Sequence, residues 1–395
     1  MQPAARLQAV PPYPFTQWAT YCRAAQERGA DLIRLDVGSP DLPPPAPVIE
    51  RLCEAARDSS AHGYAGYSES EPLREAIAAY YARRFDVRLD RDREVVPLLG
   101  SKEGIVNLAR ACVDPGDVVL VPDPGYTPYS AGATMAEGEV VRFALRAEQR
   151  YEPDLEAIPP SIVHRAKLLW INYPNNPTGA VASLDLLERC VSFARRHGIV
   201  LCHDAPYTEI AYGDVRPPSI LEIPDARDVA VEFHSFSKTF NMAGWRIGTA
   251  VGRSDVLQHL LRVKSNADSG IFWPLQQAAI EALSTDAEWI RDRNAVYRER
   301  LQLLAKAFEG IGFQAPLPRA GIYLWIRLGE NVSSEAFALR LLGTTGISVA
   351  PGTFFGPAGE GHLRVSATAP TEKIREAADR LVEASGTIRQ AAFRP

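Results

Sequence analysis

Apolar runs and amphipathic segments alternate along the middle of the chain, between residues 95 and 252. Continuous apolar runs of strand length are typical of strands buried on both faces, whereas apolar positions three or four residues apart indicate one face of a helix. Strands are expected at residues 94–101, 117–123, 166–174, 198–204, 229–235 and 246–252, with helices such as 102–113 between them. This order predicts an α/β fold in which a mostly parallel sheet is covered by helices on both faces.

The segment 183–198 carries clear helix signals. Ser183 can cap its N-terminus, and Gly198 follows its last turn. Leu187 and Val191 are four residues apart, which puts them on one face of the predicted helix.

The pattern changes after about residue 275, where long amphipathic segments alternate with short apolar runs. Helices are expected at 274–285, 289–312, 333–346 and 371–385, and strands at 321–328, 347–352 and 362–368. This alternation predicts a smaller α+β domain, completed by an N-terminal helix at 18–29 and a strand at 32–38. The expected division is a large domain at 48–290, and a small domain at 291–395 together with the N-terminal arm 1–47.

Composition excludes several classes of protein and leaves the fold prediction unchanged. The 395 residues are 46% apolar and 23% charged, which is ordinary for a globular protein, and the net charge of −5 offers no attraction to nucleic acid. The first residues lack the apolar core of a signal peptide and no apolar run reaches membrane-spanning length, so we expect a cytoplasmic protein. The five cysteines are scattered and the histidines show no ligand spacing, so we expect neither a disulfide framework nor a metal.

The stretch SFSKTFNMAGWRIG, residues 235–248, is the first candidate for chemistry. Lys238 follows a predicted buried strand, with the hydroxyls of Ser235 and Ser237 before it and the guanidinium of Arg246 after it. A lysine in this setting can hold an aldehyde cofactor as a Schiff base while its neighbours bind a phosphate. A lysine in a surface loop is the alternative, and the pattern S-x-S-K alone does not decide between them.

Polar residues at other strand ends supply the remaining contacts that pyridoxal phosphate needs. Asp204 can keep the pyridine nitrogen protonated, although an aspartate here can also cap a helix. Tyr207 and Asn176 can donate to the phenolic oxygen, and Tyr126 can stack on the ring. A buried tyrosine needs no such role, however, since packing alone explains it.

Four further residues complete the candidate site. Ser101 and Lys102 stand where a strand meets a helix, and the backbone N–H groups at such a helix start bind anions. Gly38 ends a predicted strand and can allow close approach of the backbone to a ligand, or can simply form a turn. Arg364 lies within an apolar strand, where it either faces water or clamps a substrate carboxylate.

The whole chain resembles a known family in five stretches. They are GSKEGI, VPDPGY, INYPNNPTGAV, EFHSFSKTFNMAGWRIG and VKSNADSG. These residues look like fold-type I pyridoxal-phosphate enzymes of the class I/II aminotransferase family, and most closely like its LL-diaminopimelate aminotransferase branch. The resemblance implies pyridoxal 5′-phosphate as cofactor, an amino acid and a 2-oxo acid as substrates, and a homodimer with shared active sites.

The resemblance also implies roles for individual residues. Lys238 would be the Schiff-base lysine and proton shuttle, and Asp204 the partner of the pyridine nitrogen. Asn176 and Tyr207 would contact the phenolic oxygen. Arg364 would clamp the α-carboxylate of the substrate.

The loop after residue 63 would serve the second subunit. By resemblance, Tyr64 reaches the phosphate at the neighbouring site. Glu69 and Glu71 follow it, and a carboxylate at the mouth of a pocket favours a substrate with a cationic distal end, such as LL-diaminopimelate. Both glutamates can equally be solvated loop charges. The sequence departs from the family pattern at Ser39 and Trp273, near the expected distal end of the substrate.

Two other functions compete with transamination. The same cofactor site can support elimination, replacement or cyclisation on an amino acid, because the protein decides which bond breaks. A non-catalytic regulator with an aminotransferase-like domain is the other alternative. It would usually carry an appended DNA-binding module, for which the chain has neither room nor charge.

Overall fold

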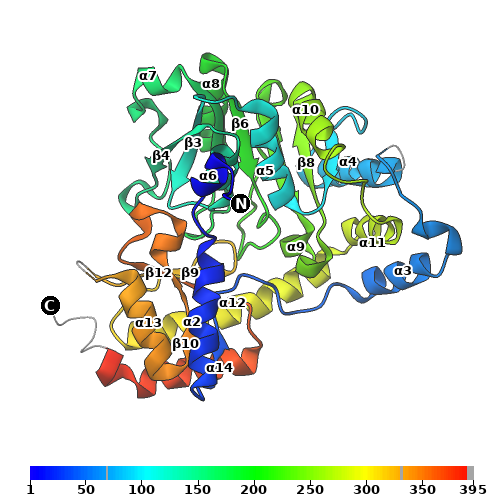
Figure 1. Ribbon diagram of the computed structural model, residues 1–395. Helices are drawn as coiled ribbons and strands as arrows, with labels where there is room; N and C mark the ends of the chain where they lie inside the picture. The colour runs from blue at the N-terminus through cyan, green and yellow to red at the C-terminus, as the bar shows by residue number, and fades with distance from the viewer. Residues whose placement is uncertain (68–69, 330–331, 389–395) are drawn as a thin grey trace.

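A seven-stranded sheet forms the centre of the molecule, as the computed structural model shows for residues 1–67, 70–329 and 332–388 (Figure 1). Across the sheet its strands are β2 (Val95–Leu98), β8 (Gly248–Gly252), β7 (Ala230–Ser235), β6 (Val200–Asp204), β5 (Ala166–Asn172), β3 (Val118–Asp123) and β4 (Glu139–Ala144). The pairings from β7 to β4 are all parallel, and β8 is antiparallel to both of its neighbours. The predicted α/β fold with a mostly parallel sheet is confirmed.

Alternate residues of the central strands face opposite layers of helices. Leu169 and Ile171 of β5 belong to one apolar core, whereas Leu168 and Trp170 belong to another. The first core contains α3 (Ala46–Ala56), α4 (Glu71–Phe85), α8 (Leu184–His197) and α11 (Trp273–Leu283), and the second contains α5 (Ser101–Cys112), α6 (Pro128–Met135) and α10 (Ser254–Lys264). Burial on both faces explains why these strands read as continuous apolar runs.

The predicted ends of α8 are confirmed in atomic detail. The Ser183 hydroxyl accepts a hydrogen bond from the backbone N–H of Leu186 at 3.1 Å. Gly198 has a φ of 65°, a left-handed conformation that costs glycine little, and it ends the helix.

A second body of structure lies below the sheet in Figure 1. It contains the antiparallel strands β11 (Ala350–Pro351), β12 (His362–Ser366) and β9 (Tyr323–Arg327), and the parallel pair β1 (Ile33–Arg34) and β10 (Ile347–Ser348). Its helices are α2 (Pro14–Glu27), α12 (Ala287–Gly310), α13 (Ser334–Thr345) and α14 (Thr371–Glu383). One apolar core joins the N-terminal segment to the C-terminal part of the chain.

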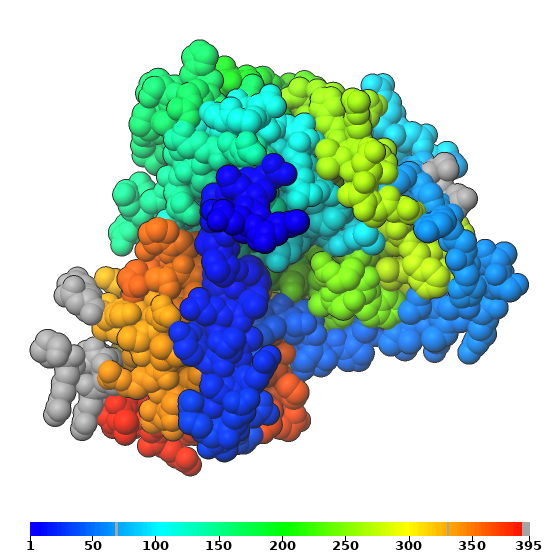
Figure 2. Space-filling model, in the orientation of Figure 1, coloured from blue at the N-terminus to red at the C-terminus, as the bar shows by residue number. Residues whose placement is uncertain are grey.

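The long helix α12 crosses the predicted domain boundary at residue 290. Tyr297, near its middle, packs with Tyr207 of the upper part, whereas Leu304 belongs to the lower core. Figure 2 shows the N-terminal segment as a continuous band on the surface of both parts. The exact division into 48–290 and the remainder stays a prediction.

The elements β4, α6 and α10 were not predicted from the sequence, and one predicted strand is shorter. The edge strand β4 is mostly accessible, so its sequence is not a continuous apolar run. The strand expected at 32–38 is reduced to β1. Just beyond it, the backbone carbonyl of Asp36 accepts from Arg364, and the Asp36 carboxylate accepts from Arg34.

No helix among the described residues is long and apolar enough to cross a membrane. The cytoplasmic location stays a prediction.

Candidate active site

A cavity of about 390 Å³ lies at the carboxyl ends of the central parallel strands. The register pairs Asn172 of β5 with Asp204 of β6, and Asp204 with Phe233 of β7, so the three strands end side by side. Ligands of open α/β sheets bind at this edge. The turns after these strands bring Asn176, Tyr207 and Lys238 to the same cavity.

Lys238 lies in α9 (Phe236–Thr239), a single turn that follows β7 directly. Its ammonium group donates a hydrogen bond to the backbone carbonyl of Gly38. Burial, together with the positive charges of Arg364 and Arg246, lowers the pKa of Lys238 to about 7. An amine with such a pKa is partly neutral at physiological pH, as a nucleophile or a general base must be.

Asp204 is only 3% exposed, yet one of its carboxylate oxygens is free to bind a ligand. Its Oδ2 atom accepts from the Tyr129 hydroxyl at 2.6 Å, whereas Oδ1 has no partner among the described residues. Burial raises the pKa of Asp204 to about 6, and the hydrogen bond from Tyr129 opposes that rise. A buried acceptor without a donor fits the protonated pyridine nitrogen of the expected cofactor.

Tyr129 itself was not predicted. It lies three residues after the predicted Tyr126, in the sequence YTPY, and that second tyrosine was the available signal. Tyr126 lines the cavity as well, and its ring meets the ring of Tyr129 edge to face.

The two residues expected at the phenolic oxygen face the cavity but are engaged elsewhere. The Tyr207 hydroxyl is 3.0 Å from the hydroxyl of Tyr323, and the Asn176 side-chain oxygen accepts from Arg364 at 3.1 Å. Both contacts leave capacity for a further hydrogen bond, since a hydroxyl can donate and accept and the Asn176 amide has two N–H groups.

The residues predicted to bind phosphate gather at the start of α5. Ser101, Lys102, Ser235, Ser237 and Arg246 all line the cavity. A Cβ atom on Gly100 would lie 2.4 Å from an Arg246 nitrogen, and one on Gly248 would lie 2.7 Å from the Ser101 backbone nitrogen. Glycine at position 100 therefore leaves room for the guanidinium, and glycine at position 248 lets β8 approach the start of α5, where the backbone N–H groups attract an anion.

Arg364 is buried, with 4% exposure, which excludes the alternative that it faces water. Its guanidinium donates to the Asp36 carbonyl at 2.6 Å and lies 4.1 Å from the centre of the Tyr323 ring. Its Nε atom has no partner in the described part of the chain. This donor is available for a carboxylate in the cavity.

Several residues that line the cavity carried no sequence signal. Tyr13 and Phe15 come from the N-terminal segment, and Tyr323 begins β9. Lys102 lies with its ammonium 4.2 Å from the centre of the Tyr13 ring, so the arm covers the predicted phosphate side of the cavity. These neighbours come from distant parts of the chain, and only the tertiary fold brings them together.

Of the residues expected to serve a second subunit, Tyr64 and Glu71 do not line this cavity. The Tyr64 side chain is 88% exposed, and Glu69 lies outside the described residues. Glu71 begins α4 and forms an ion pair with Arg91 at 2.6 Å. Trp273 begins α11.

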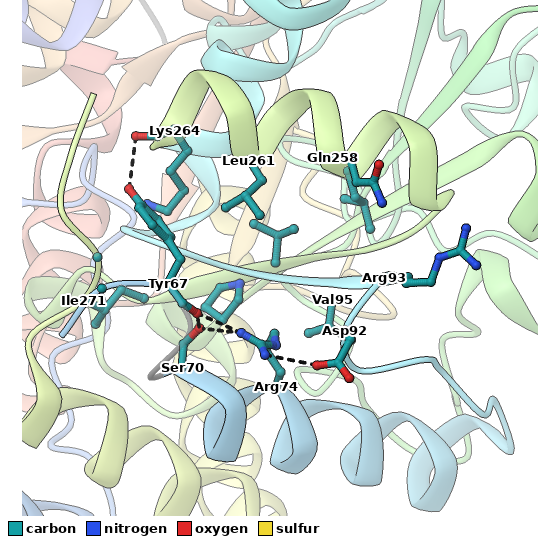
Figure 3. A pocket seen from close by; sticks show the side chains of 15 residues that line it. Tyr67, Ser70, Arg74, Asp92, Arg93, Val95, Gln258, Leu261, Lys264 and Ile271 are labelled. Carbon is teal, nitrogen blue, oxygen red and sulfur yellow. Dashed lines mark hydrogen bonds and ion pairs between the residues drawn. The ribbon is translucent and has the colours of Figure 1, made fainter. Parts of the chain in front are cut away.

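A separate cavity of about 350 Å³ lies near this loop, between α4 and α10 (Figure 3). Tyr67 donates to the backbone of Lys264 at 3.1 Å, and Arg74 reaches Ser70 and Asp92. Of the predicted site residues that the structure describes, none lines it.

Comparison with known proteins adds independent evidence. The family described as aminotransferase class I and II matches residues 30–381. An LL-diaminopimelate aminotransferase from Dehalococcoides mccartyi is 44% identical over 376 residues, which cover 95% of this chain and 97% of the relative.

Two solved structures are also close. BacF from Bacillus subtilis has a TM-score of 0.94 and 36% identity, over 98% of both chains. A probable N-succinyldiaminopimelate aminotransferase from Thermus thermophilus has a TM-score of 0.89 and 40% identity, over 94% of this chain and 99% of that one.

Tyr129→Phe is expected to raise the pKa of Asp204 in the cofactor-free protein above its value of about 6. A hydrogen bond to the charged form favours that form, so its loss should shift the pKa upward by roughly one to two pH units. The measurement is a pH titration of the ¹³C-labelled aspartate carboxyl by NMR. Tyr126→Phe removes a hydroxyl from the same cavity and serves as the control. An unchanged Asp204 titration in Tyr129→Phe would refute the assignment.

Proposed function

This chain belongs to the aminotransferase class I and II family, and on that premise we propose that its amino donor carries a cationic group at the distal end, as LL-diaminopimelate does. The enzyme is a pyridoxal-phosphate-dependent aminotransferase that moves the amino group to a 2-oxo acid. Elimination, replacement and cyclisation are less well supported, because the similar proteins reported above are aminotransferases, apart from BacF, whose name states no reaction. The observation that carries the aminotransferase chemistry is the meeting of Lys238 and Asp204 in one cavity.

When bound, pyridoxal 5′-phosphate supplies an aldehyde that condenses with the amino group of the substrate and a ring that takes up the electron pair from Cα. Lys238 would bind that aldehyde and, once displaced by the substrate, would move the proton at Cα. Asp204 would hold a proton on the pyridine nitrogen through its free Oδ1 atom. Asn176 and Tyr207 would donate to the phenolic oxygen.

The remaining residues would bind and orient. Ser101, Ser235, Ser237 and Arg246 would hold the phosphate through hydroxyl and guanidinium donors, and the start of α5 would add its backbone N–H groups. Lys102 would add positive charge there, and Tyr126 would stack on the ring. Arg364 would hold the α-carboxylate of the substrate, with Gly38 beside it.

We also infer a homodimer in which Tyr64 reaches the phosphate of the neighbouring site. The exposure of this tyrosine supports the inference, and so does the exposed Phe272, 47% accessible, whose ring lies 6.0 Å from that of His62 in the same region. Large aromatic side chains that face solvent together are typical of a surface covered by a partner.

The distal preference rests on the names of relatives and on the loop that follows Tyr64. Glu69 is the candidate for contact with a distal ammonium group. Glu71 is a weaker one, because it pairs with Arg91 in its own subunit. Ser39 lines the cavity and would face the substrate as well.

Lys238→Ala is expected to fold and to lose turnover, because no amine is then present to bind the aldehyde or to move the Cα proton. Steady-state transaminase assays measure the loss. Lys306→Ala, at an exposed position of α12, is the matched control and should behave as the parent. Undiminished turnover in Lys238→Ala would contradict the proposed chemistry.

Asp204→Ala should slow the reaction by more than the roughly 10²–10⁴-fold typical of one acid–base group, since cofactor binding falls as well. Asp204→Asn keeps the shape and removes the charge, and it should lose nearly as much. The measurements are kcat and the dissociation constant of the cofactor. A normal rate and normal cofactor affinity in both variants would show that another carboxylate has this role.

The substrate proposal predicts a higher kcat/KM for LL-diaminopimelate than for lysine, ornithine, arginine or glutamate. Glu69→Gln should reduce that preference about tenfold to a hundredfold, the effect of about 1.5–3 kcal/mol for one charge-assisted contact. Glu71→Gln is the comparison, with a smaller expected effect. A parent enzyme that prefers an acidic or uncharged side chain would refute the proposal.

A further inference from the structure

A buried ion pair lies directly behind the site, on the strand that ends in Asp204. His203 of β6 and Glu232 of β7 are opposite each other in the register and are 0% and 1% exposed. The His203 Nδ1 atom is 2.8 Å from a Glu232 carboxylate oxygen. Neither residue lines the cavity, and the chemistry proposed above does not use them.

The surroundings of Glu232 are those of an ionised carboxylate. It accepts from the hydroxyls of Tyr81 and Ser219 and from the backbone N–H of Ile220, each at 2.8 Å, in addition to His203. Burial acts to raise the pKa of Glu232, but the hydrogen bond and charge of His203 outweigh it, so this pKa lies below its ordinary value. Four donors converge on two oxygens, which leaves no need for a proton on the carboxylate.

The other ring nitrogen of His203 also faces an acceptor. Its Nε2 atom is 3.0 Å from the backbone carbonyl of Tyr173. A carbonyl oxygen can only accept, and so can an ionised carboxylate. Both nitrogens of His203 must therefore carry hydrogen, which makes the ring an imidazolium.

The carbonyl that His203 holds belongs to the turn that carries Asn176. This turn is tied to β6 a second time by Asn172, whose side chain donates to the Asp204 carbonyl at 2.6 Å and accepts from the Asn176 backbone N–H at 2.8 Å. Because His203 directly precedes Asp204, its positive charge also lies next to the carboxylate that must stay ionised in the interior.

We propose that His203 is a positioning residue, a buried imidazolium clamped by Glu232 that fixes the Asn176 turn and keeps Asp204 ionised. The proposal rests on the function proposed above, because it assigns these two residues to the cofactor. A buried ion pair can often be replaced without loss of stability. The proposal therefore gives the Glu232 charge a role in the site besides any contribution to folding.

The first test is ¹⁵N NMR of the full-length, cofactor-loaded protein at pH 7.5. Both ring nitrogens of His203 should appear as protonated N–H, with the surface histidine His164 as the reference. A neutral ring with one bare nitrogen would overturn the proposal. This readout is independent of the substrate, so it is not affected if the donor is something other than a diamino acid.

The second test separates positioning from packing with the variants His203→Gln, Glu232→Gln and the double variant. Either single change should weaken cofactor binding about tenfold, shift the visible absorption band of the bound cofactor, and lower kcat about tenfold with KM nearly unchanged. His164→Gln replaces an exposed histidine outside the pair. It is the control and should alter none of these properties.

The double variant distinguishes a positioning role from a role in packing alone. It leaves no unpaired charge, so its Tm should recover toward that of the parent, because the unfavourable burial of a lone ion is gone. Cofactor affinity, the absorption band and kcat should stay impaired. Recovery of all of them with the Tm would show that the pair serves folding alone, and would refute the positioning role.

Discussion

The burial of the Asp204 carboxylate is the constraint on which the rest of the site depends. A carboxylate removed from water favours its neutral form, and burial accordingly raises the pKa of this group to about 6. A site that needs the anion must therefore surround it with donors and positive charge. The Tyr129 hydroxyl donates a hydrogen bond to the Asp204 carboxylate, and the positive charge of His203 acts to lower the pKa of that carboxylate. One oxygen remains without a partner in the described chain, and the protein is thus ready to take a cationic ring nitrogen.

The position of Lys238 depends on a second buried charge. Arg293 of α12 is 4% exposed and donates to the backbone carbonyls of Lys238 and Thr239 at 2.9 and 2.6 Å. It also donates to the Glu209 carbonyl at 2.7 Å, and burial lowers the pKa of Arg293 to about 10. One guanidinium from the long helix therefore fixes the turn that follows β7. Since α12 also packs in the lower core, the geometry of the lysine is coupled to the second body of structure.

The sequence predicted the parts of the site that follow from strand ends, and little else. Apolar runs locate parallel strands, and parallel strands end together, so Asp204, Asn176 and Lys238 could be expected at one edge. Tyr323 and Phe15 come from the other body of structure, and no local pattern connects them with the sheet. The edge strand β4 was missed because one side of it faces water, and its sequence consequently lacks the continuous apolar character of the central strands.

Gly38 illustrates how much of the site depends on tertiary packing. Its φ is not positive, so a left-handed conformation is not the reason for glycine at this position. A Cβ atom at this position would nevertheless lie 1.8 Å from the Tyr323 hydroxyl, and the Gly38 carbonyl accepts from Lys238. Glycine is needed here for space, where the N-terminal segment passes between β9 and the turn after β7. Because three distant segments meet at this one residue, the cavity is complete only when the N-terminal arm, the sheet and the lower strands have all assembled.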